Sequence, residues 1–263
     1  MFNPTVAGLT VRATLGRRRA LLFAVPAVIL IALTLVLRAT RPAGAPWPDH
    51  VLGDFGFSVL LPLTALIIGT GVLGAEIDDG SAIHLLATPV RRSSVILTKF
   101  AVATVLTMIF AAVPELIAAL ISGGGYSEAT VTITPGSPPV FTSGAVVNNT
   151  DFALGLFVGA LVGAVIYNAI FVMVSAATTR AIAVGLLYVL IWEALLANFV
   201  SGARLLSVSH YALGIANGIA HAPTLNAGLT VGVSVVMGAI ITVAALALAI
   251  NLLSGFTLKG EPA

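Results

Sequence analysis

Six long runs of apolar residues constrain this chain more than any other feature of its sequence. Each run is long enough to cross the hydrocarbon core of a bilayer as a helix, and a helix pairs its own backbone groups, which lipid cannot do. Only 8% of the residues are charged, whereas about 25% is usual in a soluble domain. The sequence predicts an all-α, polytopic membrane protein with one transmembrane domain, 1–263, and six transmembrane helices at residues 21–37, 55–74, 100–121, 152–177, 182–200 and 229–253.

The basic residues predict how these helices are oriented. With the N-terminus in the cytoplasm, nine of the twelve lie inside: Arg12, Arg17, Arg18, Arg19, Arg91, Arg92, Lys99, Arg180 and Lys259. Only Arg38, Arg41 and Arg204 lie outside. Basic residues favour the cytoplasmic side, so we expect a multi-pass protein of the cytoplasmic (inner) membrane with both termini cytoplasmic. The basic residues are then topology signals, and no nucleic-acid partner is expected.

Two segments on the outer side have distinct compositions. Residues 123–151 are rich in Gly, Pro, Thr and Ser and hold a β-like stretch at 130–134. Residues 205–220 are semi-apolar, too short and too polar to span. We expect them to form a re-entrant or interfacial helix before the last span.

The largest cytoplasmic loop covers residues 75–99 and begins with acidic residues. Ser81 is placed to cap a short helix, the acids before it suit the positive end of the helix dipole, and Pro89 ends the helix at about Thr88. The segment predicts an amphipathic helix along the inner membrane surface. It either connects two spans or docks a cytoplasmic partner. Its acidic cluster favours docking, because an anionic leaflet would repel it.

The pattern of this loop is similar to a known family. Glu76, Gly80-Ser81, Leu85-Leu86-Ala87-Thr88-Pro89, Arg92 and Lys99 resemble the loop after the second span of type-2 ATP-binding-cassette (ABC) permeases. The six spans, the cytoplasmic termini and the re-entrant stretch also match that family.

The resemblance implies a membrane permease subunit of an ATP-driven exporter. Such permeases dimerise with the same or a related permease and dock on two copies of a separate ABC ATPase, where Mg-ATP binds. By resemblance, the coupling helix would contact the ATPase through Glu76, Asp78, Asp79, Gly80, Ser81, His84, Leu85, Leu86, Arg91 and Arg92. Outward export is the usual direction in this family, with multidrug efflux as one example, and hydrophobic drugs, lipids and peptides are all open as substrates.

The chain has none of the common catalytic or metal-binding motifs. It contains no P-loop, no His-Glu-x-x-His, no Gly-x-Ser-x-Gly and no cysteine. Its four histidines lack metal-site spacing. We therefore expect no catalytic residue, no metal and no cofactor of its own, and ATP hydrolysis on a partner chain. Residues 69–74 match the dinucleotide fingerprint but end a membrane span, so their glycines predict close helix packing or a bend at the inner end of the span instead.

Two carboxylates lie inside apolar runs. A charge at the bilayer centre costs about 3 kcal/mol or more, so Glu193 and Glu115 should face protein or water, or be protonated. Each is either part of the substrate path or a structural hydrogen-bond partner. Trp192, beside Glu193, offers aromatic surface to a substrate or packs against lipid.

Three glycines spaced by four predict a helix-packing face. Gly155, Gly159 and Gly163 lie on one side of the fourth span and let another backbone approach closely. The partner helix is either within the chain or across a dimer.

An alternative function keeps the same fold. An ion-gradient-driven secondary transporter would use Glu193 or Glu115 as its coupling carboxylate. A membrane enzyme fits less well, because apart from these two acids the sequence shows no polar constellation inside the spans.

Overall fold

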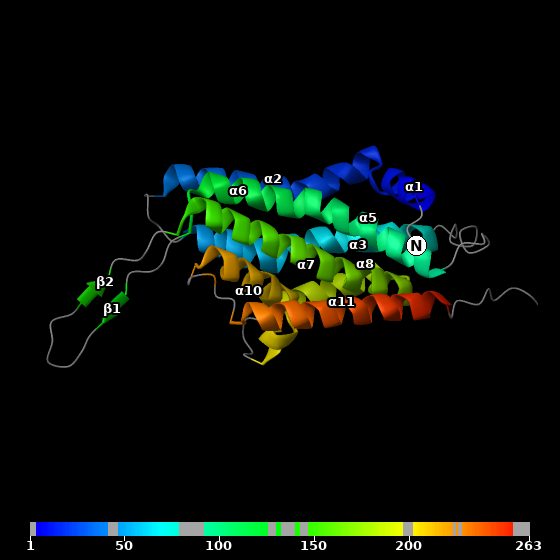
Figure 1. Cartoon of the computed structure of the whole chain (residues 1–263). Coiled ribbons are helices and arrows are strands. Elements are labelled where there is room, and N and C mark those ends of the chain that lie inside the picture. Colours follow the sequence, from blue (N-terminus) through cyan, green and yellow to red (C-terminus); the bar gives the residue numbers. More distant parts are fainter. Residues whose placement is uncertain are drawn as a thin grey trace, which may run out of the picture.

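The computed structural model is a bundle of helices with different features at its two ends (Figure 1). The structure describes residues 4–41, 47–78, 92–125, 130–132, 140–142, 147–196, 202–222, 225 and 228–254. Helix α1 (Pro4–Thr14) lies at one end, which we call the α1 end. A ribbon of strands β1 (Thr130–Thr132) and β2 (Val140–Thr142) projects from the other, which we call the ribbon end.

Five helical stretches in the described part of the chain are long and apolar enough to cross a membrane. They correspond to five of the six predicted spans and cover Leu21–Thr40, Asp49–Leu73, Arg92–Ser122, Asn149–Ala177 and Val231–Leu253. Their elements are α2 (Arg17–Thr40), η1 (Asp49–Leu60) with α3 (Leu61–Asp78), α5 (Arg92–Thr107) with η2 (Met108–Ala112) and α6 (Val113–Ser122), α7 (Asn149–Ala177), and α11 (Val231–Ser254).

Two of these spans contain π-helical turns, η1 and η2. At η2 the cause is visible in the sequence: Pro114 has no N–H and cannot bond to the turn before it. The N–H of Val113 instead bonds to the carbonyl of Met108, five residues back. The wider turn places Pro114 and Glu115 at the junction of η2 and α6.

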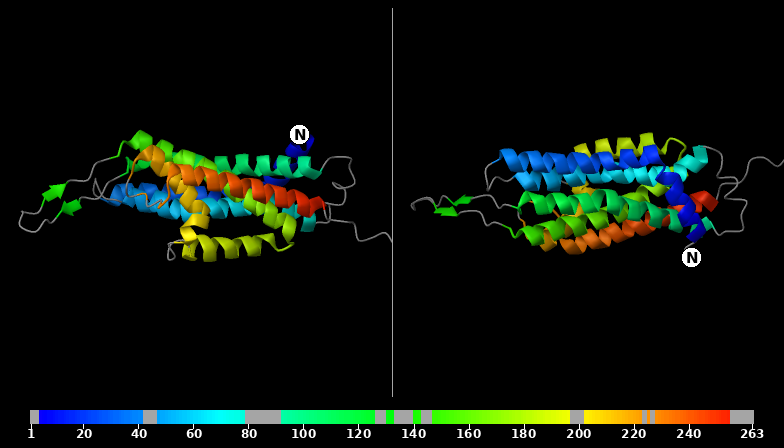
Figure 2. Two further views of the ribbon diagram at one scale, coloured as in Figure 1. Left: turned by 60° about the horizontal axis from the view of Figure 1, so that its bottom comes forward. Right: turned by 90° about the horizontal axis from the view of Figure 1, so that it is seen from above.

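The remaining predicted span, 182–200, is described up to Leu196. It begins as α8 (Ala181–Leu187) and continues as the π-helical η3 (Tyr188–Leu196). Its apolar helix, Ala181–Glu193, has fewer residues than the other five stretches, and residues 197–201 lie outside the described part. Figure 2 shows α8 and η3 along the edge of the bundle in both views.

The segment before the last span forms η4 (Ala203–Leu206) and α10 (Val208–Ala220). All residues from Val208 to Ala216 are buried, and α10 packs against α7 and α11. Helix α10 therefore lies within the bundle, whereas an interfacial helix would expose one face. The sequence had left both arrangements open for residues 205–220.

The described elements are helical apart from the ribbon. Strands β1 and β2 pair antiparallel, with Val131 opposite Phe141. The β-like stretch predicted at 130–134 thus forms a strand over its first three residues, while Ile133 and Thr134 lie outside the described part.

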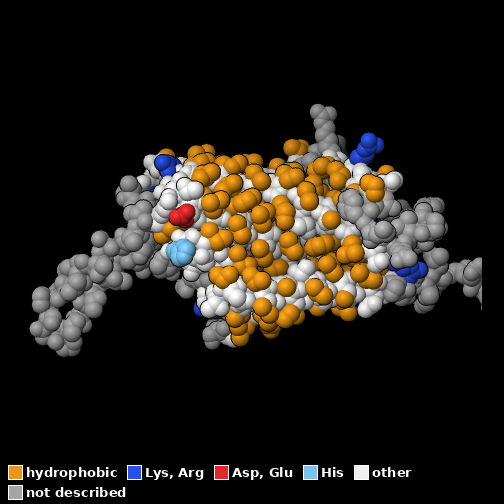
Figure 3. All heavy atoms as spheres, viewed as in Figure 1, with side chains coloured by type: hydrophobic (Ala, Val, Ile, Leu, Met, Phe, Trp, Pro, Cys, Tyr) orange, Lys and Arg blue, Asp and Glu red, His pale blue; other side chains and the backbone are white. Residues whose placement is uncertain are grey.

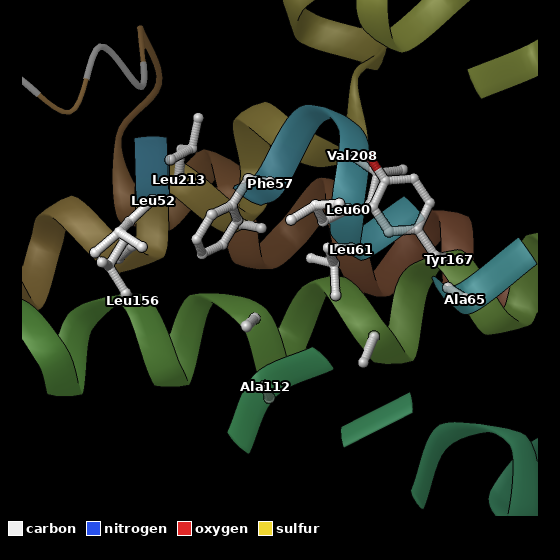
Figure 4. Close-up of a cluster of buried hydrophobic side chains, with 14 of the residues drawn as sticks. Leu52, Phe57, Leu60, Leu61, Ala65, Ala112, Leu156, Tyr167, Val208 and Leu213 are labelled. Atoms are coloured by element: carbon white, nitrogen blue, oxygen red, sulfur yellow. The ribbon is translucent and has the colours of Figure 1, made fainter. Parts of the chain in front are cut away.

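The core of the bundle is built around α7. This helix packs against α3, α10 and α11, and Tyr167 and Phe171 on it are fully buried with stacked rings. Figure 4 shows side chains from η1, α3, η2, α7 and α10 meeting in one cluster, with Phe57 and Leu61 facing α7. Because small residues on α7 admit the neighbouring helices, this cluster is closely packed.

The outside of the bundle is apolar along its middle. Figure 3 shows hydrophobic side chains over most of the visible face, with charged side chains near the two ends. Leu21 on α2 and Val243 on α11 are 68% and 67% exposed. Such a surface is stable in lipid rather than in water.

Candidate functional site

The Glu193 carboxylate is buried inside the bundle and accepts several hydrogen bonds. Its Oε1 accepts from the Tyr188 hydroxyl at 3.0 Å and from the Val208 N–H at 2.9 Å. Its Oε2 accepts from the hydroxyls of Ser207 at 2.6 Å and Ser209 at 2.8 Å. The side chain has no exposed surface. Donors from two stretches of the chain, η3 and the start of α10, thus converge on one carboxylate.

These bonds make Glu193 the cap of α10. The first N–H groups of a helix lack partners within it and are usually bonded by the N-cap side chain. Ser207 occupies the N-cap position but makes no such bond; its hydroxyl donates to Glu193 instead. A carboxylate at this position also suits the positive end of the helix dipole. The described partners favour the structural interpretation of Glu193, and its place in a substrate path stays a prediction.

Trp192 adds a bond between η3 and η4, the short helix that precedes α10. Its indole N–H donates to the carbonyl of Leu206 at 3.1 Å. The side chain is half-buried. The polar edge of the ring is therefore used within the chain, and a contact between its apolar face and a substrate stays a prediction.

The glycine face of α7 lies against α10 of the same chain. A Cβ built at Gly155 would lie 2.5 Å from the Ala216 carbonyl oxygen, and one at Gly159 would lie 2.6 Å from that of Ala212. A Cβ at Gly163 would lie 2.7 Å from Leu61 and 3.2 Å from Ala212. Helix α10 therefore runs antiparallel to α7, and its N-terminus lies beside Tyr167 near the middle of α7 (Figure 4). The partner of this face, left open by the sequence, is intramolecular.

Gly69 provides a second close approach. A Cβ there would lie 2.9 Å from the Phe171 Cβ and 3.0 Å from the Asn168 Oδ1. The Asn168 amide nitrogen donates to Thr107 at 2.9 Å, so this amide joins α7 to α5 beside α3. The close-packing interpretation of Gly69 agrees with this geometry, whereas Gly71 has no atom within 4 Å of its Cβ position.

Glu115 is also buried, but in a different setting. Its side chain is 4% exposed and faces Gly56 on η1. It borders a small pocket between α2, η1, α3, η2, α6 and α7. Among the described residues, none bonds to its Oε1. The sequence offered the same two interpretations for Glu193 and Glu115. In the structure they differ in hydrogen bonding, because Glu193 accepts several bonds whereas Oε1 of Glu115 accepts none from the described residues.

Most of the predicted coupling segment lies outside the described residues. This applies to Asp79, Gly80, Ser81, His84, Leu85, Leu86 and Arg91. The backbone of Glu76 and Asp78 belongs to the end of α3, but their side chains lie outside the described part. Arg92 begins α5, and its Nη1 donates to the Leu253 carbonyl on α11 at 2.8 Å.

Lys99 is a buried basic residue whose contact the sequence did not reveal. It has no exposed surface, and its Nζ donates to the Val72 carbonyl on α3 at 2.7 Å. Helices α3 and α5, which flank the coupling segment, are therefore bonded to each other within the bundle, and α5 is bonded to α11. Sequence patterns had indicated only that Lys99 marks entry into the membrane.

A family comparison identifies the chain. Residues 15–194, well over half of it, match the model of the ABC-2 family transporter proteins. The chain belongs to this family. Among curated proteins, none matches the sequence significantly. An ABC-2 permease is a membrane transport subunit without catalytic activity of its own, and the family implies an ABC ATPase as partner. The match ends within η3, one residue after Glu193, and α10, whose first N–H groups Glu193 caps, lies beyond it.

Proposed function

We propose that this ABC-2 permease is the membrane subunit of an ATP-driven exporter of the cytoplasmic membrane. The observation that carries the proposal is the family match, which includes residues 75–99. Mg-ATP would bind to two copies of a separate ABC ATPase. A second permease subunit, identical or related, would complete the transporter, and each chain would contribute one permease domain.

The distribution of basic residues supports an orientation with the α1 end in the cytoplasm. Arg12 lies in the last turn of α1, Arg92 begins α5, and Arg180 precedes α8. Helix α1 and the starts of α5 and α8 all lie at the α1 end of the bundle (Figure 1). Arg38 lies at the ribbon end, where its Nη1 donates to the Ile121 carbonyl. Basic residues favour the cytoplasmic side. Both termini would then be cytoplasmic.

The contacts beside the coupling segment suggest how movement of the ATPase reaches the spans. Residues 79–91 connect α3 to α5, and the Lys99–Val72 bond joins these helices within the bundle. The Arg92–Leu253 bond extends the connection to α11. A push on the segment would therefore move three helices together, because side-chain bonds join α3 to α5 and α5 to α11.

Replacing Leu85 and Leu86 together with alanine is expected to uncouple the ATPase from transport. Truncating a central apolar contact of an interface costs about 2 kcal/mol or more, which corresponds to about 30-fold in affinity. The measurement is co-purification with the ABC ATPase, together with substrate-stimulated ATP hydrolysis in proteoliposomes.

The chain offers a matched control for that variant. Leu205 and Leu206 are also adjacent leucines, about half exposed, on η4, and their alanine double variant should leave ATPase docking unchanged. Normal docking and transport in the Leu85/Leu86 variant would show that this segment is not the coupling element. If the chain co-purifies with no ABC ATPase at all, the proposed function is wrong.

A further inference from the structure

The pocket beside Glu115 is a polar site within apolar walls. Its wall contains two phenylalanine rings, Phe57 and Phe110, and no basic side chain. In this conformation it has room for about one water-sized group. The lining residues come from six elements, α2, η1, α3, η2, α6 and α7.

The Glu115 carboxyl has unused hydrogen-bonding capacity at this pocket. Its Oε1 is buried and has no hydrogen-bond partner among the residues that the structure describes. The hydroxyl of Thr64, another polar group of the lining, already donates to the Leu60 carbonyl at 2.8 Å. A buried carboxyl without a partner is unfavourable. A ligand that donates to Glu115 would therefore gain more here than at a saturated site.

Gly56 makes this arrangement possible. A Cβ at this position would lie 2.9 Å from both carboxyl oxygens of Glu115, which is too close for an unshifted side chain. Only a glycine lets the carboxyl take its present position against η1. The site therefore depends on two residues from different spans, Gly56 and Glu115.

Glu193 shows what a structural carboxylate in this bundle looks like. Its two oxygens accept bonds from Tyr188, Ser207, Val208 and Ser209. Glu115 has no comparable set of donors in the described part of the chain. Both oxygens of Glu193 therefore already accept hydrogen bonds, as in a helix cap. Oε1 of Glu115 accepts none from the described residues and is available to a ligand.

The chemistry of the pocket selects a particular class of ligand. An ammonium group is compact, carries up to three N–H donors and is attracted to carboxylates and to the faces of aromatic rings. A divalent metal ion would need six or more oxygen ligands or retained water, and the lining side chains supply oxygens only from Glu115 and Thr64.

We propose that this pocket binds the ammonium head of an amphiphilic organic cation, with Glu115 as its counter-ion. The apolar part of the ligand would remain among lipid-facing side chains. Val25 and Ile29, which flank the lining residues of α2, are 49% and 46% exposed and offer such a surface. The inference rests on the proposed export function, because it names the substrate class that the permease would carry.

The test compares two probes that differ in charge but share an apolar chain. Binding of n-hexylammonium and of 1-hexanol is measured by calorimetry on the full chain in nanodiscs, with empty nanodiscs as reference. The wild-type protein should prefer the cation. Glu115→Gln should weaken cation binding about 10- to 100-fold, as expected for the loss of a hydrogen bond to a charged group, and should leave 1-hexanol binding unchanged.

Two further variants separate the site from general effects. Asp54→Asn also removes a carboxylate, but Asp54 is an exposed residue of η1 that pairs with His50, so cation binding should persist. Gly56→Ala should weaken cation binding, because its Cβ displaces the Glu115 carboxyl. Gly71→Ala is its control, because no atom lies within 4 Å of that Cβ position.

Folding is followed in parallel by thermal unfolding of each variant. Glu115→Gln should unfold close to the wild-type temperature, because it replaces a buried carboxyl, which can carry a charge, with a neutral amide of the same size. The inference is overturned if wild-type protein binds both probes equally, or if Glu115→Gln binds n-hexylammonium as tightly as wild type. Because this assay needs no ATPase, its failure is distinguishable from failure of the exporter proposal, which co-purification tests.

Discussion

Glu193→Ala is expected to lower the free energy of unfolding by about 3–5 kcal/mol. The substitution removes the acceptor of three hydroxyl groups and of the first N–H of α10. One buried donor left without an acceptor costs about 1–3 kcal/mol, and hydroxyl groups that find new partners reduce the total. Unfolding in detergent, followed by circular dichroism against temperature or denaturant, measures this change.

Glu193→Gln and Trp192→Phe make this prediction specific. Glutamine keeps the shape but places an amide nitrogen against donors of η3 or α10, so it should cause a smaller but clear loss. Trp192→Phe removes one bond to the Leu206 carbonyl and should cost about 1 kcal/mol. If Glu193→Gln unfolds like wild type but no longer supports export, the residue acts in the transport path and the capping prediction is contradicted.

Gly159→Ala is expected to separate α10 from α7. The new Cβ would lie 2.6 Å from the Ala212 carbonyl oxygen and 2.9 Å from the Ala216 Cβ. Backbone atoms of two packed helices cannot move aside as a flexible side chain can, so the helices must shift. Overpacking of this kind costs about 1–3 kcal/mol. The unfolding temperature of the purified chain, and its recovery from the membrane fraction, measure the effect.

Gly232→Ala provides the matched control. Gly232 is also a glycine within a membrane helix, but no atom lies within 4 Å of its Cβ position. Its alanine variant should be as stable as wild type or slightly more stable, because alanine favours helices. Equal stability of Gly159→Ala and Gly232→Ala would mean that α10 does not pack against this face of α7.

Glu193 and Glu115 show why the candidate site was harder to predict than the fold. Both were recognised as carboxylates in apolar runs, with a structural and a functional interpretation open for each. The donors that reach Glu193 come from residues up to 16 positions away, across residues 197–201. Gly56, which faces Glu115, belongs to a different span. No periodicity in the sequence connects these residues.

The spans themselves were largely predictable because insertion of an apolar helix is a local property. A run of about 20 apolar residues satisfies its backbone within the helix and its side chains in lipid, whichever helices surround it. Five predicted spans have counterparts in the structure, and the family resemblance based on residues 75–99 agrees with the family match. The run at 182–200 is helical as α8 and η3 up to Leu196, and its predicted end lies outside the described residues.

The sequence alone established a membrane protein of the ABC-2 type, most of its spans, and the residues that needed an explanation. The tertiary structure showed that the glycine face of α7 receives α10 of the same chain, that Glu193 caps α10, and that Glu115 borders a pocket. The physical reason is the range of the interactions. Burial in lipid depends on neighbours along the chain, whereas a hydrogen-bond partner or a close helix contact depends on which segments meet in space.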